Sequence, residues 1–248
     1  MKKQYANVIE IHNNIIEAQY KLSREQQLLL FKIVMEINEG RYESNTTMIT
    51  KDWEMYVLVT KLNVAETAKY LNIDKRTIRK VIQSLQKVII THVDLDKKTK
   101  TDTQVIGRAR YINDEQEVQI MVNDEMGKYL KDMSMNYTQL NLKEIVTLKS
   151  QYSIRIYQLA RKLQNIKPPY TKAITYTLEE FQKMIGSNYN TWQDLKKRVL
   201  EPSKKELIKN TRLWIDFEPI KESKGNKGGR PKVTKIKLLM ELSKKETK

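Results

Sequence analysis

Residues 176–220 read YTLEEFQKMIGSNYNTWQDLKKRVLEPSKKELIKNTRLWIDFEPI. The Thr-x-x-Glu pattern that begins at Thr177 is typical of a capping box, which opens a helix. Gly186 is expected to stop that helix, because glycine readily takes the left-handed backbone of a helix end. A second, basic helix is predicted from Thr191, and a strand-like run follows from Arg212. This order of helix, turn, basic helix and strand predicts a helix–turn–helix followed by a β-wing.

The residues that follow complete the predicted wing. A second strand-like run, KVTKIKLLM (232–240), is separated from the first by the polar, glycine-rich loop KESKGNKGGRP (221–231). A basic wing of this kind is expected to contact DNA phosphates or the minor groove, and a solvated hairpin loop would look similar. The wing residues predicted to contact DNA are Lys224, Lys227, Arg230 and Lys232.

The first half of the chain repeats the same order. A capping box at Ser23 precedes the apolar helix LLLFKIVMEI, and Gly40 follows as a stop. The run VAETAKYLNIDKRTIRKVIQSL (64–85) predicts a second helix–turn–helix, and β-branched runs after it predict a small antiparallel sheet. The predicted fold class is therefore α+β, mainly α, with two tandem winged-helix domains related by internal duplication. The predicted domains are residues 1–137 and 138–248.

The charge of the chain is concentrated in its second half. The formal net charge is +16, and residues 1–137 contain 21 Lys and Arg against 19 Asp and Glu, a net of +2. Residues 138–248 contain 25 against 11, a net of +14. This asymmetry predicts that the second domain binds a polyanion, with nucleic acid favoured and an anionic membrane surface as the alternative.

The predicted recognition helix of the second domain has two faces. At 100° per residue, Trp192, Leu195, Val199 and Leu207 share one side and are predicted to be core. Pro202 is expected to kink or end the helix. The residues predicted to contact DNA are Lys196, near the edge of the core side, and five residues that point away from it: Asn190, Gln193, Lys197, Arg198 and Lys205. Arg198 suits guanine, Asn190 and Gln193 suit adenine, and Lys196 suits a phosphate. An ordinary solvated helix face is the alternative interpretation.

The first domain has a weaker basic pattern. Arg76, Arg79 and Lys80 lie largely off the apolar stripe of its predicted recognition helix. Because this domain is nearly neutral, the sequence leaves two roles open. One is auxiliary DNA contact, and the other is dimerisation.

Several classes of function are disfavoured by composition. The chain has no cysteine and two histidines, His12 and His92, so no metal site, no cofactor and no catalytic residue is predicted. A rolling-circle nickase would need paired histidines, and ATP-driven unwinding would need a GxxxxGK[ST] loop that is absent from the sequence. The few Phe and Trp residues disfavour RNA recognition. With no signal peptide and no membrane-spanning run, a cytoplasmic location is expected.

Three segments together resemble the Rep_3 family of plasmid replication initiators. IIEAQYKLSREQQLLLFKIV (15–34) is similar to the first helix of the family and its lead-in. LKSQYSIRIYQLARKL (148–163) is similar to the family's Ser–Ile/Leu–Arg–hydrophobic–Tyr helix, here Ser153 to Tyr157. The stretch quoted first matches the family's pattern of a helix that ends in glycine, followed by a basic helix with Val-Leu-Glu-Pro.

The resemblance implies an initiator that binds repeated origin sequences, called iterons, mainly through the second domain. Lys196, Lys197 and Arg198 then occupy the basic positions of the recognition helix. The partners it implies are double-stranded DNA, a second copy of the chain, and a host initiator or replicative helicase. A dimer is expected to repress its own promoter, and no C-terminal extension for host factors is expected. A winged-helix transcriptional repressor without a role in replication is the alternative that the residues alone leave open.

Overall fold

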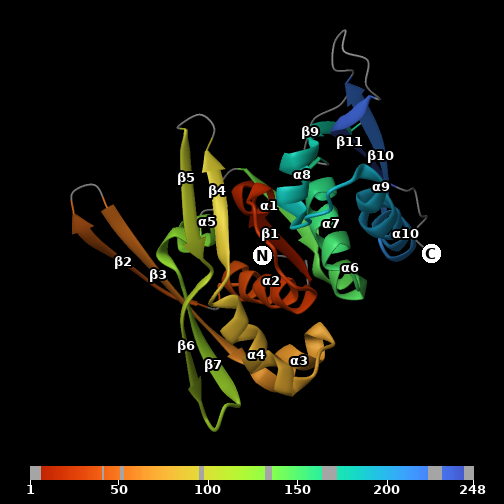
Figure 1. Cartoon of the computed structure of the whole chain (residues 1–248). Coiled ribbons are helices and arrows are strands. Elements are labelled where there is room, and N and C mark those ends of the chain that lie inside the picture. The colour runs from red at the N-terminus through yellow and green to blue at the C-terminus, as the bar shows by residue number, and fades with distance from the viewer. Residues whose placement is uncertain are drawn as a thin grey trace. The chain divides into compact units, whose positions relative to one another are not determined.

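The computed structural model describes residues 7–40, 42–50, 53–94, 98–131, 136–163, 172–222 and 231–242. The chain forms two compact units, Met1–Val146 and Thr147–Lys248 (Figure 1). The sequence prediction instead divided the chain between residues 137 and 138. The difference arises because the strand Tyr137–Asn141 pairs with the strand Val8–His12 and so belongs to the first unit.

The first unit combines a buried helix, a helix–turn–helix and three small sheets. Its elements are β1 (Val8–His12), α1 (Asn13–Glu17), α2 (Arg24–Asn38), β2 (Tyr42–Thr50), β3 (Trp53–Asn63), α3 (Val64–Leu71), α4 (Lys75–Leu85), β4 (Ile89–Asp94), β5 (Thr99–Gln104), β6 (Ile106–Ile112), β7 (Glu117–Val122), α5 (Asp124–Lys131), β8 (Tyr137–Asn141) and α6 (Leu142–Thr147).

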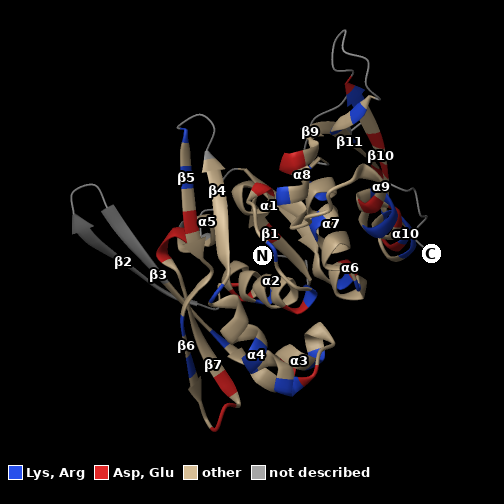
Figure 2. Cartoon of the chain, in the orientation of Figure 1, with Lys and Arg blue, Asp and Glu red and all other residues tan. Residues whose placement is uncertain are grey.

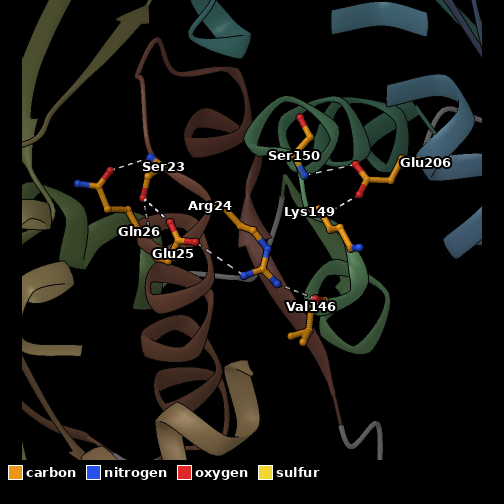
Figure 3. Close-up of polar contacts among 8 residues, drawn as sticks. All are labelled: Ser23, Arg24, Glu25, Gln26, Val146, Lys149, Ser150 and Glu206. Carbon is orange, nitrogen blue, oxygen red and sulfur yellow. Dashed lines mark hydrogen bonds and ion pairs between the residues drawn. The ribbon is translucent and has the colours of Figure 1, made fainter. Parts of the chain in front are cut away.

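Helix α2 forms the centre of this unit. The run Leu28–Phe31 is fully buried, and α3, α4, α5 and β1 all pack around the helix. Ser23 begins α2 with the predicted capping box, in which Ser23 Oγ accepts from Gln26 N–H and the Gln26 side chain accepts from Ser23 N–H (Figure 3). The next residue, Arg24, donates to the Val146 carbonyl at 2.9 Å. This bond satisfies a carbonyl in the last turn of α6.

The strands after α4 divide between two sheets, whereas the sequence predicted one. β4 and β5 form their own antiparallel hairpin. β6 and β7 join β2 and β3 in a four-stranded antiparallel sheet of order β2-β3-β7-β6. The turn between β6 and β7 contains Asn113, Asp114 and Glu115, all with left-handed backbone.

The second unit has a helix–turn–helix packed against a three-stranded sheet. Its elements are α7 (Gln151–Leu163), β9 (Lys172–Thr177), α8 (Leu178–Ile185), α9 (Trp192–Leu195), the π-helical turn η1 (Lys196–Leu200), α10 (Glu201–Asn210), β10 (Leu213–Glu222) and β11 (Lys232–Leu242). The sheet is antiparallel in the order β10-β11-β9. Each unit therefore contains a helix–turn–helix followed by antiparallel strands, which confirms the predicted α+β arrangement.

Candidate nucleic-acid interface

The helix–turn–helix of the second unit is defined by its helix ends. Thr177 begins α8 with a capping box to Glu180, and Gly186 ends it with a left-handed backbone at φ 70°. Thr191 then begins α9 by accepting a hydrogen bond from Asp194 N–H. The turn between the helices is held by Gln182, whose side chain donates to the Tyr189 carbonyl at 2.8 Å. These capping positions are the ones that the sequence predicts.

Pro202 was expected to kink or end the recognition helix, and the structure shows that it does not end it. The helix continues from Trp192 to Asn210, with a π-helical turn at Lys196–Leu200. Within this turn Glu201 N–H bonds the carbonyl of Lys196, five residues earlier. A proline cannot donate a backbone hydrogen bond, and its ring clashes with the carbonyl four residues before it. The wider π turn accommodates Pro202 by placing one extra residue in the turn, so residues beyond it are rotated from their ideal α-helical positions.

The two faces of this helix separate apolar from polar side chains. Leu195, Val199 and Leu207 are fully buried, as predicted. Trp192 was expected to belong to the core, but it is only half-buried. It is the first residue of the helix. The predicted DNA-contacting residues on and before the helix are all exposed: Asn190, Gln193, Lys196, Lys197, Arg198 and Lys205.

Four of these exposed residues surround one shallow hollow. Its lining consists of Gln193, Lys196, Lys197, Glu201, Pro202 and Lys205. Residues on both sides of the π turn therefore face the same space. Arg198 is not in this lining; its Nε lies 3.5 Å from the Asp194 carboxylate, one turn earlier. Since both side chains of that pair are exposed, the pair is weak and can exchange for another partner.

Sequence reasoning missed a second charged cluster beside the helix. Lys204 forms an ion pair with Asp216 of β10 at 2.8 Å, and its ammonium lies 5.8 Å from the centre of the Trp214 ring. Burial favours a higher pKa for Asp216, but the Lys204 ammonium and the Phe217 N–H hold the pKa of this carboxyl below its ordinary value, with a smaller contribution from Lys196. The charge of Lys204 is thus balanced by a carboxylate of the sheet. No pattern in the sequence predicts this pairing, because it depends on which helix face meets β10.

The wing is formed by β10 and β11. Glu222 and Lys232 are paired across the two strands at the last position of the ladder, and Lys232 is exposed. Glu222 also forms an ion pair with Lys235 at 2.9 Å, and this lowers the pKa of Glu222. The predicted wing residues Lys224, Lys227 and Arg230 lie outside the described residues.

The first unit also has a well-formed helix–turn–helix. Asn63 and Asp74 cap α3 and α4, and Asn72 ends α3 with a left-handed backbone. Arg76, Arg79 and Lys80 are exposed on α4, as the predicted interface requires.

An acidic turn faces the cationic residues of α4. Arg79 forms an ion pair with Glu115 in the β6–β7 turn, and its guanidinium lies 5.0 Å from the centre of the Tyr111 ring. Figure 2 shows this turn as an acidic tip. One hollow is lined by Val64, Lys75, Arg76, Ile78, Arg79, Tyr111, Asp114 and Glu115. Positive and negative charges are therefore mixed at this recognition helix.

Comparison with family models decides the assignment. The model described as "Initiator Replication protein, WH1" matches residues 8–161, and the model described as "Initiator Rep protein, WH2" matches residues 177–239. The chain belongs to the Rep_3 family of initiator proteins. The two matches also establish the two winged-helix domains that the sequence predicted.

Individual relatives are more distant. A replication initiation protein of Escherichia coli is 27% identical over 105 residues, which is 41% of this chain and 33% of that relative. The chain thus matches about a third of that protein's length. The crystal structure of the Pi initiator protein in complex with iteron DNA is similar over 98% of this chain and 100% of that one, with a TM-score of 0.66 and 18% identity. This likeness shows that the fold is shared.

Two further observations concern the described part of the chain. No helix there is both long and apolar enough to cross a membrane. No group of three or more His, Asp or Glu side chains among the described residues is placed to hold a metal ion.

Proposed function

We propose that this Rep_3 chain is a plasmid replication initiator that binds iterons in double-stranded DNA, mainly through the helix Trp192–Asn210. The observation that carries the proposal is the division of this helix into a fully buried apolar face and an exposed face. The exposed face includes Gln193, Lys196, Lys197, Arg198 and Lys205, and the exposed Asn190 precedes the helix. A helix–turn–helix presents such a face to the major groove. The Pi initiator, whose fold this chain shares, was crystallised with iteron DNA.

Each exposed side chain has a proposed role that follows from its chemistry. Arg198 has forked donors that match guanine O6 and N7, and its weak pair with Asp194 leaves it free to change partner. Asn190 and Gln193 suit adenine, since an amide can both donate and accept. Lys196, Lys197 and Lys205 suit phosphates, as point charges on flexible stems. Lys232 and the wing residues outside the described ranges are proposed to add phosphate or minor-groove contacts.

The first unit is proposed to pair with a second copy of the chain and to contact DNA only weakly. Two apolar side chains of β4, Ile89 and Val93, are 47% and 38% exposed, while the intervening Ile90 is buried. Because alternate residues of a strand share a face, Ile89 and Val93 form one apolar surface. Sedimentation of Ile89→Lys tests this role. A shift from dimer to monomer supports it, and an unchanged oligomeric state contradicts it.

The proposed activity is binding and recruitment, not catalysis by the chain. Bound at iterons, the protein would promote opening of the adjacent origin DNA and recruit a host initiator or replicative helicase in the cytoplasm. The dimer would repress the protein's own promoter.

A replication assay tests the proposal. A plasmid whose only replication functions are this gene and its cognate repeats should replicate, and the Arg198→Ala gene should not support it. If the protein binds the repeats and represses its promoter but no plasmid is maintained, the chain is a winged-helix repressor instead.

A further inference from the structure

Helix α7 contains a buried charge that the proposed DNA contacts do not explain. Arg155, in the Ser153–Tyr157 motif, is only 1% exposed, and Ser153 and Tyr157 beside it are fully buried. Placing a guanidinium in a protein core costs free energy unless its donors are satisfied. The donors of the Arg155 guanidinium therefore need hydrogen-bond partners inside the protein.

Arg155 binds the end of the first helix of the helix–turn–helix. Its Nε donates to the carbonyl of Met184 at 2.8 Å, and a terminal nitrogen donates to Gln158 Oε1 at 2.8 Å. Gln158 is itself held, since its amide donates to the Ile154 carbonyl at 3.3 Å. Met184 lies in the last turn of α8, where carbonyls lack partners within the helix and the helix dipole favours a cation. Arg155 thus fixes α7 to the C-terminal end of α8.

Glu206 binds the N-terminal end of α7. This residue lies in α10, beyond the π turn of the recognition helix, and its carboxylate accepts from the backbone N–H groups of Lys149 at 2.6 Å and Ser150 at 3.4 Å (Figure 3). These two residues immediately precede α7. A carboxylate at a helix N-terminus satisfies unpaired N–H groups and complements the dipole. Glu206 thus fixes the recognition helix to the start of α7.

The two contacts together connect both members of the helix–turn–helix to one buried helix. The turn between α8 and α9 spans only residues 186–191, so the orientation of the recognition helix depends on what holds each helix. We propose that Arg155 and Glu206 are positioning residues, which set the orientation of the recognition helix and so determine sequence specificity without touching DNA. The proposal rests on the proposed function of that helix.

Base readout and phosphate attraction respond differently to a small rotation of the helix. A bidentate contact to a base edge needs fixed geometry, whereas attraction to phosphates depends mainly on net charge. A purely structural role for Arg155 and Glu206 would weaken all binding in proportion to the loss of folded protein. A positioning role weakens binding to the specific site alone.

The experiment uses the full chain and a duplex enriched by the unaltered protein from a random-sequence library. Arg155→Lys keeps the charge but loses the forked geometry, and Glu206→Gln loses the charge but keeps an acceptor. The matched controls are Arg212→Lys, at an exposed position after α10, and Glu218→Gln, at an exposed position on β10. The dissociation constant is measured for the enriched duplex and for a scrambled duplex of the same composition, together with the near-UV circular dichroism of each variant.

Arg155→Lys and Glu206→Gln are each expected to weaken binding to the enriched duplex about tenfold, the effect of losing one base contact, with little change for the scrambled duplex. Both controls should keep the full preference. If the folded variants retain that preference, the proposal is overturned. If Arg155→Lys does not fold, Glu206→Gln decides alone, because it keeps a hydrogen-bond acceptor at the N-terminus of α7. Failure of the unaltered protein to enrich any sequence would contradict the proposed function instead.

Discussion

Arg198 and Lys197 are adjacent in sequence, and their proposed contacts with DNA differ. Replacing Arg198 by Ala removes the proposed guanine contact, and replacing Lys197 by Ala removes a proposed phosphate contact. Arg198→Ala should therefore relax the base preference at one position of the site. Lys197→Ala should weaken binding to all sequences and leave the preference intact.

The size of the Arg198 effect follows from its surroundings. Its pair with Asp194 spans 3.5 Å, and the two side chains are 64% and 48% exposed, so exchanging this partner for a base costs at most about 1 kcal/mol. A bidentate contact to guanine contributes about 1–3 kcal/mol of discrimination. At 1.4 kcal/mol per tenfold, Arg198→Ala should lose about 5- to 140-fold of preference at one base pair. Lys197→Ala should instead reduce the slope of log affinity against log salt by about 0.9.

Fluorescence anisotropy with a set of single-base variants of the enriched duplex, at several salt concentrations, separates the two effects. Asp194→Asn is the matched control, because it removes the ion-pair partner and leaves Arg198 in place. This variant should keep the preference. If Arg198→Ala lowers the affinity for all variants equally, or if Lys197→Ala relaxes one base position, the division of roles is refuted.

Three other perturbations have expected outcomes. Leu195→Ala removes a fully buried side chain on the apolar face of the recognition helix. It should lower the free energy of unfolding, measured by urea titration, by about 2–5 kcal/mol. A smaller loss would mean that the side chain is not tightly packed. The pKa of Asp216 is held below its ordinary value of about 4. The ionised carboxylate therefore stabilises the fold at pH values above about 4, and this stabilisation disappears as the pH falls through the lowered pKa. The difference in Tm between the unaltered chain and Asp216→Asn should therefore be constant near neutral pH and vanish in acid, and a difference that persists in acid would contradict the assignment. Glu115→Gln removes the carboxylate paired with Arg79 and should strengthen binding to a scrambled duplex, whereas unchanged binding would show that the first unit does not approach DNA.

Local signals in the sequence predicted the ends of the helices well. The capping boxes at Ser23 and Thr177 and the stop at Gly186 are all confirmed. Each depends on hydrogen bonds within a few residues, which is why side-chain type and spacing were sufficient. The apolar face of the recognition helix was predicted for a similar reason, because its residues follow helical periodicity.

Contacts between distant segments could not be predicted in this way. The strand β3 was missed, and so was its pairing with β7. The sequence of residues 53–63 does not indicate which strand lies beside them. The same holds for β1 and β8, which pair across more than a hundred residues. The π turn before Pro202 was also missed, because a proline in a helix is equally consistent with a break.

For the candidate site, residue type indicated which side chains would be exposed but not what they would contact. Arg79 was predicted to be available for DNA, whereas the structure pairs it with Glu115 of the β6–β7 turn. Lys204 and Lys205 look alike in sequence, yet only Lys204 meets a carboxylate of the sheet. The buried contacts of Arg155 and Glu206 likewise depend on how α7 packs against the helix–turn–helix.

Binding to iterons can be tested by a footprint of the purified protein on fragments of its own plasmid, at near-physiological salt. Several direct repeats about two helical turns apart should be protected, and Arg198→Ala should abolish this protection. Protection of a single inverted repeat at a promoter would contradict the initiator assignment in favour of a repressor. Uniform protection of all fragments would contradict sequence-specific reading by the helix Trp192–Asn210.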